Sequence, residues 1–298
     1  MFKYILYNLL IYIETNSKFC FFYFFFLKFI TAIKILLIRA FGISKNNQSL
    51  DIIITVAKKD FHKVEKCIKS LKRHVQDNIS EIFLIGPGGK SIFEIAKKNK
   101  CIFVDEKILI DKSKLGIKYK YKNVDRSNWL YQQLLNYKGV LVLGKENFKL
   151  AFNSDTQLFV NENFLRKKKI LFNITNDYHK PYFDVAKILL NINRVTHFSF
   201  TAHYTVYDRT ILSIMLKKIE NFYKLDWHKV IIKKCNFKEL SCHSEFETYG
   251  QFFHYYYRDN MILEYWFNRT NFSKNKFVQL FQNFFCKSIS NHSWNSKN

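Results

Sequence analysis

The stretch DIIITVAKKD at residues 51–60 decides the fold, because it passes from a buried-strand pattern to a helix start within ten residues. A β-branched run followed at once by polar residues is typical of a buried parallel strand. Asp60 stands where a helix N-cap is expected. The helix predicted after it carries its apolar residues on one face: Phe61, Val64, Cys67, Ile68, Leu71 and Val75.

Two more strands follow at the spacing of a repeated strand and helix unit. EIFLIGP at 81–87 and CIFVDE at 101–106 are apolar runs, and Ser91 with Glu94 predicts a capping box for the helix between them. Strands joined by helical crossovers indicate an α/β fold with an open, mostly parallel sheet flanked by helices. Ligands of such sheets bind beyond the carboxyl ends of the strands. Four residues fall at that edge: Thr55, Lys58, Pro87 and Asp105.

The next segment predicts a helix over DRSNWLYQQLLNYKG at 125–139. Arg126 and Trp129 in its first turn suit a phosphate and a stacked base or sugar. The alternative is an ordinary helix start with an aromatic anchor. The chain contains neither G-x-G-x-x-G nor G-x-x-x-x-G-K-S/T, which disfavours a dinucleotide fingerprint and a P-loop.

A short polar segment then interrupts the apolar sequence. VLVLG at 140–144 and NFKLAF at 147–152 predict strands that deliver AFNSDTQLF at 151–159. In this stretch Asp155 closely follows Asn153. A cluster of such turn-forming residues is, taken alone, most often a surface turn. After a parallel sheet, however, the same residues fall at the edge where ligands bind.

Further candidates lie downstream. His179 lies beside one of only two prolines, and His203 and Arg209 flank the point where a strand over 197–207 is expected to give way to a helix. Glu245 and Glu247 begin a helix with an aromatic face. On a helix these two side chains point to nearly opposite sides, so at most one is expected to face a cleft. Favourable interaction with the helix dipole would by itself explain both glutamates.

The two ends of the chain differ from its middle. Residues 1–45 form an apolar, aromatic helical segment, and residues 1–41 fit either a helix lying in a membrane interface or an appendage packed on the domain. The longest uninterrupted apolar run, 19–27, is shorter than the ~20 residues that span a bilayer. The main domain is expected over 50–268. Residues 269–298 form a basic tail, with disorder expected at its very end.

Composition limits the class of function. The net charge of +24 would suggest nucleic acid, but only eight of the 48 basic residues are Arg and the Lys are scattered, so no nucleic-acid partner is expected. The six cysteines show no C-x-x-C pair and no zinc-ligand spacing. They are interpreted as reduced thiols of a cytoplasmic protein that is peripheral, at most, to the inner face of a membrane.

The polar residues suit one chemistry in particular. A glycosyl donor bound through its diphosphate needs a divalent cation, and Mn²⁺ or Mg²⁺ prefers oxygen ligands such as Asp155. An inverting transfer also needs a carboxylate to accept the proton of the acceptor hydroxyl, for which Glu245 or Glu247 is the candidate.

Five blocks in order carry a resemblance to a known family: DRSNW at 125–129, NSDT at 153–156, NDYHKPYF at 176–183, SFTAHYTVYDR at 199–209 and SEFETYG at 244–250. Together they resemble a largely uncharacterised bacterial family of GT-A-like nucleotide-diphospho-sugar transferases, with D-R-S-G-W, D-A-D-T, Y-H-x-P-Y and S-E-x-E-T-Y-G signatures. The resemblance covers about residues 50–268. It implies a GT-A fold and glycosyl transfer from a nucleotide-sugar donor to a surface glycan or lipid-linked acceptor.

On this resemblance Asp155 binds the metal and Asn153 the ribose, while Arg126 and Trp129 bind the donor. His179, His203 and Arg209 are assigned to the acceptor or the diphosphate, and Thr55 and Asp105 to the donor edge of the sheet. Two positions depart from the family pattern, since Asn153 replaces the first Asp of D-A-D and Asn128 replaces a Gly. The lost carboxylate predicts weak metal binding, and the alternative is a non-catalytic GT-A-like binding or scaffold protein at a membrane surface.

Overall fold

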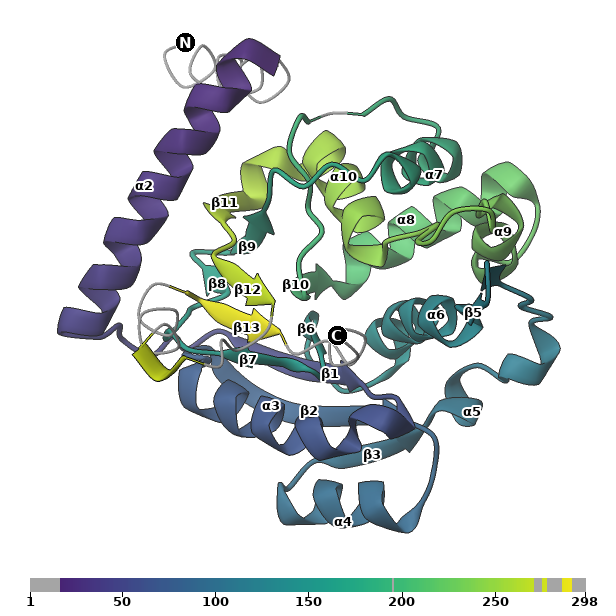
Figure 1. Ribbon diagram of the computed structural model, residues 1–298, viewed down its shortest axis with the longest axis horizontal. Helices are drawn as coiled ribbons and strands as arrows, with labels where there is room; N and C mark the ends of the chain where they lie inside the picture. The colour runs from purple at the N-terminus through teal and green to yellow at the C-terminus, as the bar shows by residue number, and fades with distance from the viewer. Residues whose placement is uncertain (1–16, 195, 271–274, 278–285, 291–298) are drawn as a thin grey trace.

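A computed structural model describes residues 17–194, 196–270, 275–277 and 286–290. Its centre is a five-stranded sheet in the order β10-β6-β1-β2-β3 (Figure 1). The bounds of these strands are β1 Ser49–Thr55, β2 Asn78–Gly86, β3 Ile102–Asp105, β6 Phe148–Asn153 and β10 Tyr204–Asp208.

The strands β1, β2, β3 and β6 of this sheet run parallel to one another, as predicted. The helices α3 (Phe61–His74) and α4 (Lys90–Lys98) are the crossovers from β1 to β2 and from β2 to β3. Right-handed crossovers put both helices on one face. The predicted α/β architecture is therefore confirmed, and the apolar face of α3 is buried at Val64, Cys67, Ile68 and Leu71.

The helix α6 (Ser127–Val142) covers the opposite face of the sheet. It approaches closely because Gly139 has no side chain: an added Cβ would lie 2.7 Å from the Ile85 side chain. The predicted strand at 140–144 is wrong, because residues 140–142 continue α6. An apolar run of this length has no period that separates a strand from a buried helix end.

Both predicted helix caps also fail in detail. Asp60 occupies the N-cap position of α3, but its side chain makes no capping hydrogen bond and forms an ion pair with Lys63 at 3.2 Å. The N-cap of α4 is Gly89, so Ser91 lies inside the helix and the predicted capping box is absent from this described helix.

The strand β10 runs antiparallel to β6. It leads directly into α8 (Arg209–Tyr223), whose buried residues Ile211, Leu212, Met215, Leu216 and Ile219 are those expected from the sequence. The direction of β10 matters for the site. Its first residue, Tyr204, pairs with Phe152 near the carboxyl end of β6, whereas Asp208 pairs with Phe148 at the amino end.

Three smaller sheets and several helices surround the main sheet (Figure 1). The smaller sheets contain β11-β9-β8 (Met261–Tyr265, Lys169–Ile174, Leu165–Arg166), β12-β13-β7 (Asn268–Thr270, Ser288–Ser290, Thr156–Leu158) and β4-β5 (Lys120–Tyr121, Val124–Asp125). The remaining helices are α5 Glu106–Leu109, α7 Lys180–Leu190, α9 Trp227–Lys234 and α10 Glu245–Tyr257, with 3-10 turns at Lys58–Asp60, Lys112–Lys114 and Arg258–Asn260.

The helix α2 (Ser17–Phe41) lies along one side of the molecule (Figure 1). Lys34 on this helix enters a buried cluster of charges with Glu162, Arg166, Glu264 and Lys287, here called the lysine–glutamate cluster. Burial disfavours the charge of Lys287, but Glu162 and Glu264 outweigh it and raise the pKa of the lysine. The cluster ties α2 to β11, through Glu264, and to Lys287 directly before β13.

The structure describes part of each predicted terminal segment. Residues 1–16 of the N-terminal segment and 271–274, 278–285 and 291–298 of the tail lie outside the described residues. The described part of the tail includes β13, whose three residues are buried. No disulfide bond joins any of the six cysteines, all of which lie within the described residues.

Candidate functional site

The carboxyl ends of β1 and β6 meet where the strand order reverses. From β1 the chain moves to β2 and β3 on one side, and it returns to place β6 on the other. Open α/β sheets bind ligands in the crevice at such a switch point. Thr55, the last residue of β1, pairs in register with Asn153, the last residue of β6. The NSDT turn therefore begins at the one position of this sheet where general topology expects a ligand.

The turn after β6 is braced from the side of α3. The Cys67 thiol donates to the Asn153 carbonyl at 3.6 Å, and Ser70 Oγ accepts from the Leu158 backbone N–H at 3.1 Å. Burial raises the pKa of Cys67, which lies close enough to Asp155 for that carboxylate to add to the effect. Asn153 and Asp155 remain partly exposed, whereas Ser154 and Thr156 are buried.

The same turn is braced on its other side by β13, which the sequence reading assigned to the tail. Ser290 Oγ lies 2.9 Å from Thr156 Oγ1 and also hydrogen-bonds to Nδ1 of His203. Ser288 and Ser290 both donate to Asn268 Oδ1, at 2.8 and 3.3 Å. The alternation Ser-Ile-Ser at 288–290, with Ile289 fully buried, is the two-residue period that could have indicated this strand.

His203 lies at this edge because β10 is antiparallel to β6. Its backbone carbonyl accepts the Asn153 N–H at 2.9 Å, and its ring packs against Trp266 with centroids 4.7 Å apart. With Nδ1 engaged by Ser290, the ring orientation is set by β13. The structure thus brings Thr55, Asn153, Asp155 and His203 together at the ends of three adjacent strands.

Asp105 lies on the same edge but farther along it. It ends β3, two strands from β1, which corresponds to about 10 Å. Its carboxylate caps α5 by accepting the Lys107 N–H at 2.9 Å. Burial, with the nearby Asp105 charge, raises the pKa of Glu106.

A second group of predicted residues converges on the loop at 240–241. Arg126 donates through Nε to the Leu240 carbonyl and through an η-nitrogen to Ser241 Oγ, both at 3.1 Å. Its guanidinium carbon lies 4.5 Å from the centre of the Trp129 ring. His179 Nε2 lies 2.8 Å from the Ser241 carbonyl oxygen. Arg126 and His179 therefore both hold the loop, and Trp129 packs on the Arg126 guanidinium.

Asn128, the other departure from the family pattern, lies exposed in the first turn of α6, and its side-chain oxygen accepts from Lys112 Nζ.

Glu245 begins α10 in a buried polar cluster. Its Oε1 accepts from Asn136 Nδ2 at 2.9 Å and its backbone N–H donates to Gln133 Oε1 at 3.1 Å. Burial raises its pKa to about 7, although Asn136 and the N–H groups of the helix start favour the charged form. Both ring nitrogens of the buried His243 lack a hydrogen-bond partner among the described residues. Groups of this kind are ordinary sites for internal water.

Glu247 is placed differently. It is completely buried, and Oε2 accepts from Ser199 Oγ at 2.5 Å and from the Phe200 N–H at 2.9 Å, while Oε1 accepts from Gln251 at 2.7 Å. A carboxylate with both oxygens engaged by the protein holds the loop before β10 against α10. The structure gives Glu247 no surface from which to contact a substrate.

Arg209 lies at the opposite edge of the sheet, so the structure does not bring it together with Asn153, Asp155 and His203. One of its η-nitrogens donates to the carbonyl oxygens of Leu143, Gly144 and Glu146 at 2.7 to 3.0 Å. The reason is the direction of β10, which ends beside the amino terminus of β6. Arg209 therefore closes the loop between α6 and β6.

The predicted cation can be tested against the residues at the switch point. Among the described residues, no group of three His, Cys, Asp or Glu side chains gathers closely enough to hold a metal ion. Asp155 supplies one carboxylate and Asn153 an amide oxygen, both hard ligands. Mg²⁺ is commonly held by one or two carboxylates together with substrate phosphates. The residues fit a cation shared with a bound diphosphate and do not form a complete protein cage.

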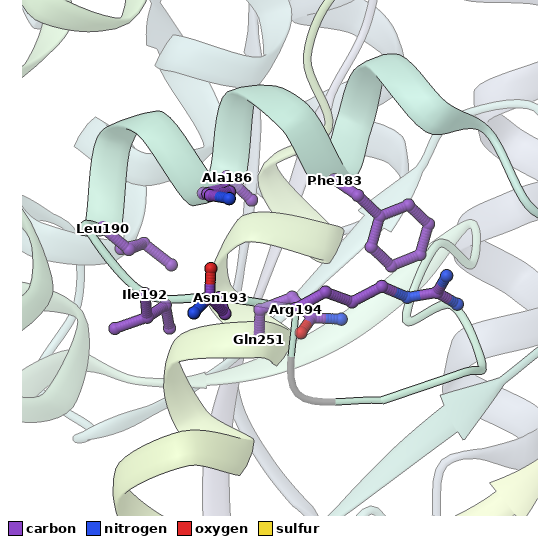
Figure 2. A pocket seen from close by; sticks show the side chains of 8 residues that line it. Phe183, Ala186, Leu190, Ile192, Asn193, Arg194 and Gln251 are labelled. Atoms are coloured by element: carbon purple, nitrogen blue, oxygen red, sulfur yellow. The ribbon is translucent and has the colours of Figure 1, made fainter. Parts of the chain in front are cut away.

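A small pocket lies elsewhere, between α7 and α10 (Figure 2). Its lining includes Phe183, Leu190, Arg194 and Gln251. Figure 2 shows Arg194 extended below Phe183, and its guanidinium carbon lies 4.2 Å from the centre of that ring. None of the candidate site residues lines this pocket, although Phe183 ends the NDYHKPYF block.

Comparison with known proteins gives a family and weak structural likenesses. The model of DUF6492, described as a family of unknown function, matches residues 47–286. No curated protein matches the chain. Similar solved structures include mouse xyloside xylosyltransferase 1 in its apo form, with 12% identity and a TM-score of 0.46 over 82% of this chain and 98% of that chain.

Two further likenesses are of the same order. An active-site mutant of LgtC has 10% identity and a TM-score of 0.45 over 81% of this chain and 86% of that one. The apo WbbM bifunctional glycosyltransferase has 10% identity and a TM-score of 0.43 over 82% of this chain and 46% of that one. At these identities and TM-scores, no activity is transferred to this chain.

Proposed function

This chain belongs to DUF6492, a family of unknown function, and we propose that it transfers a sugar from a nucleotide-sugar donor to a glycan or lipid-linked acceptor. The observation that carries the proposal is Asp155, a partly exposed carboxylate directly beyond β6 at the switch point of a parallel sheet. The ordered motif series from 125 to 250, with its resemblance to GT-A-like transferases, supports the same reading.

In this proposal the donor lies across the ends of β1 and β6. A divalent cation, Mn²⁺ or Mg²⁺, would be held by Asp155 and the donor diphosphate and would neutralise the charge of the leaving group. Asn153 offers an amide to the ribose, and Thr55 a hydroxyl beside it. His203, oriented through Ser290, faces the same edge and is assigned to the diphosphate or the acceptor. Because Asn153 carries no charge, the cation is expected to bind weakly without the donor.

Glu245 is the better of the two base candidates. Its pKa of about 7 suits proton transfer near neutral pH, and a small part of its surface is exposed. Glu247 has both oxygens engaged. The Arg126, Trp129 and His179 group lies at the start of α6, whose direction opposite to β6 puts it at the carboxyl edge. We assign this group to orienting the donor or acceptor through the 240–241 loop.

One observation favours a second candidate function. The amide of Asn153 leaves a single acidic side chain in the NSDT turn, which fits a non-catalytic protein that binds a nucleotide sugar without turning it over. Isothermal titration distinguishes the two functions, because the second gives binding of a nucleotide sugar with no release of nucleoside diphosphate.

The test of the proposed function is turnover across a panel of nucleotide sugars with Mn²⁺. The wild-type protein is expected to release nucleoside diphosphate from at least one donor, and Asp155→Ala to lose about 100-fold or more of that rate. Asp259→Ala, at an exposed position in a 3-10 turn, is the matched control and is expected to retain the wild-type rate. An active Asp155→Ala protein would sink the proposal.

A further inference from the structure

The helix α2 has two faces of opposite character. The face toward the domain is buried and consists of Cys20, Phe24, Leu27, Thr31, Ile35 and Ile38. The outer face is exposed, and every large side chain on it is apolar. Its most exposed members are Phe21, Phe22, Phe25, Phe26, Phe29, Leu37 and Phe41, with 53 to 84% of their surface accessible. A monomeric soluble domain rarely carries an apolar surface of this extent without a partner.

The inner face is fastened to the domain along most of its length. Phe24 packs edge-on against Tyr265 with ring centroids 5.1 Å apart, and Thr31 Oγ1 accepts the Tyr265 N–H at 3.2 Å. Lys34 reaches Glu162 and Glu264 at 2.7 and 2.8 Å.

At the far end of the helix, Arg39 donates to the Phe159 carbonyl at 3.2 Å. From Phe24 to Arg39 the attached stretch spans roughly 22 Å. The helix therefore lies flat against the domain.

This attachment decides between two membrane arrangements. By length and composition, Phe19–Phe41 would be able to cross a bilayer. A crossing helix would, however, carry its attached domain face into the ~30 Å hydrocarbon layer, together with the lysine–glutamate cluster. Charged side chains at that depth are strongly unfavourable. A helix that lies in the plane of the interface leaves the domain in water and buries only its outer face.

The charges near the outer face indicate the kind of surface that it fits. α2 contains no acidic residue, and the half-exposed Lys28 lies on the flank of its outer face. The Lys28 ammonium lies 4.6 Å from the centre of the Tyr265 ring, at the boundary between α2 and the domain. The chain as a whole carries a net charge of +24. Basic residues beside an apolar helix face are typical of helices that bind anionic lipid.

We propose that α2 is an in-plane membrane anchor, whose outer face inserts into the interfacial layer of a bilayer containing anionic lipid while its inner face stays on the domain. The proposal is independent of the proposed glycosyl transfer. Burial of an exposed Phe side chain in the apolar layer is favourable, so several inserted side chains suffice for binding without a spanning segment.

The first experiment is flotation of the full-length protein with vesicles of phosphatidylcholine, alone or mixed with phosphatidylglycerol. The wild type is expected to bind the mixed vesicles more tightly. Phe25→Asp combined with Phe29→Asp is expected to lower this binding at least tenfold, while Ile108→Asp, at an even more exposed apolar position on α5, leaves it unchanged. Equal binding by the double variant and the wild type, or no binding of the wild type, would overturn the proposal.

The second experiment distinguishes a helix that lies in the plane of the membrane from one that spans the bilayer. Trp is introduced singly at Phe22, Phe29 and Leu36, which share the outer face at seven-residue spacing, and its added fluorescence is quenched by lipids brominated at known depths. An in-plane helix gives the same shallow depth at all three positions, whereas a graded depth overturns the proposal. If the wild type binds no lipid and forms a dimer in the absence of vesicles, and the Phe25 and Phe29 double variant is monomeric, the outer face binds a second copy of the chain instead.

Discussion

The two edges of the central sheet contain the same kinds of residue and use them in opposite ways. At the amino edge, Lys149 and Asp51 form an ion pair with both side chains fully buried, and Arg209 donates to three backbone carbonyls. At the carboxyl edge, Asn153, Asp155 and His203 are partly exposed. The charged groups of the amino edge bond to other groups of the protein, whereas the carboxyl edge presents polar groups to a ligand.

This difference shows that residue type does not distinguish a binding residue from a structural one in this chain. His203 and Arg209 are six positions apart and flank the same strand. Because β10 runs antiparallel to β6, they lie at opposite edges of the sheet. The two edges should therefore differ in their contributions to stability and to ligand binding.

The largest effect is expected at the amino edge. Lys149→Met leaves the buried Asp51 carboxylate without its partner, so the free energy of unfolding should fall by about 3 to 5 kcal/mol. Denaturant titration measures the loss. Adding Asp51→Leu should recover most of it, since removing both charges is far less costly than removing one. If Lys149→Met alone were as stable as the wild type, the ion pair would have no structural role at the amino edge.

Glu245 links stability to pH. Burial raises its pKa from 4.5 to about 7, so the charged form is disfavoured in the folded protein. The stability associated with this group is therefore greatest below pH 4.5 and is lost as the pH rises through about 7. Glu245→Gln should be more stable than the wild type at about pH 8, by up to about 3 kcal/mol, and the gain should vanish at acid pH.

If Glu245 is the base, the same variant should lose turnover, and the wild-type rate should rise as the pH passes through about 7. Chemical denaturation and initial rates, each measured across the pH range, check the two parts separately. Full activity of Glu245→Gln would remove the base role and leave the stability effect standing.

Arg209→Gln is expected to have a smaller effect on stability. Three carbonyl oxygens lose a charged donor, which corresponds to about 2 kcal/mol of unfolding free energy. Nucleoside diphosphate affinity per folded molecule should not change, because the residue lies at the amino edge. Calorimetric titration beside a denaturation curve gives both quantities. Weakened affinity at unchanged stability would reverse the assignment.

How much of this could be predicted depends on the range of the interaction. The strands β1, β2 and β3 follow from local pattern, since each is a short apolar run with polar residues after it, and Thr55, Asn153 and Asp155 then fall at strand ends. The direction of β10 is a pairing choice that no local pattern encodes, and with it goes the location of Arg209.

The strand β13 pairs with β7 across more than a hundred residues, so a short Ser-Ile-Ser segment in a basic tail gave too weak a signal. The sequence likewise did not decide which of Glu245 and Glu247 faces a cleft. Two residues apart on one helix, they differ only in what surrounds them: Asn136 and Gln133 for one, Ser199 and Gln251 for the other.

The smallest effect on stability is expected at Asp155, and it accompanies the largest effect on binding. Calorimetric titration of the full-length protein with nucleoside diphosphates in the presence of Mn²⁺ tests this most directly. The wild type should bind at least one of them, and Asn153→Asp should bind Mn²⁺ more tightly. Asp155→Ala should bind none, with its unfolding free energy within about 0.5 kcal/mol of the wild type. Wild-type affinity in Asp155→Ala would contradict a donor site at the ends of β1 and β6.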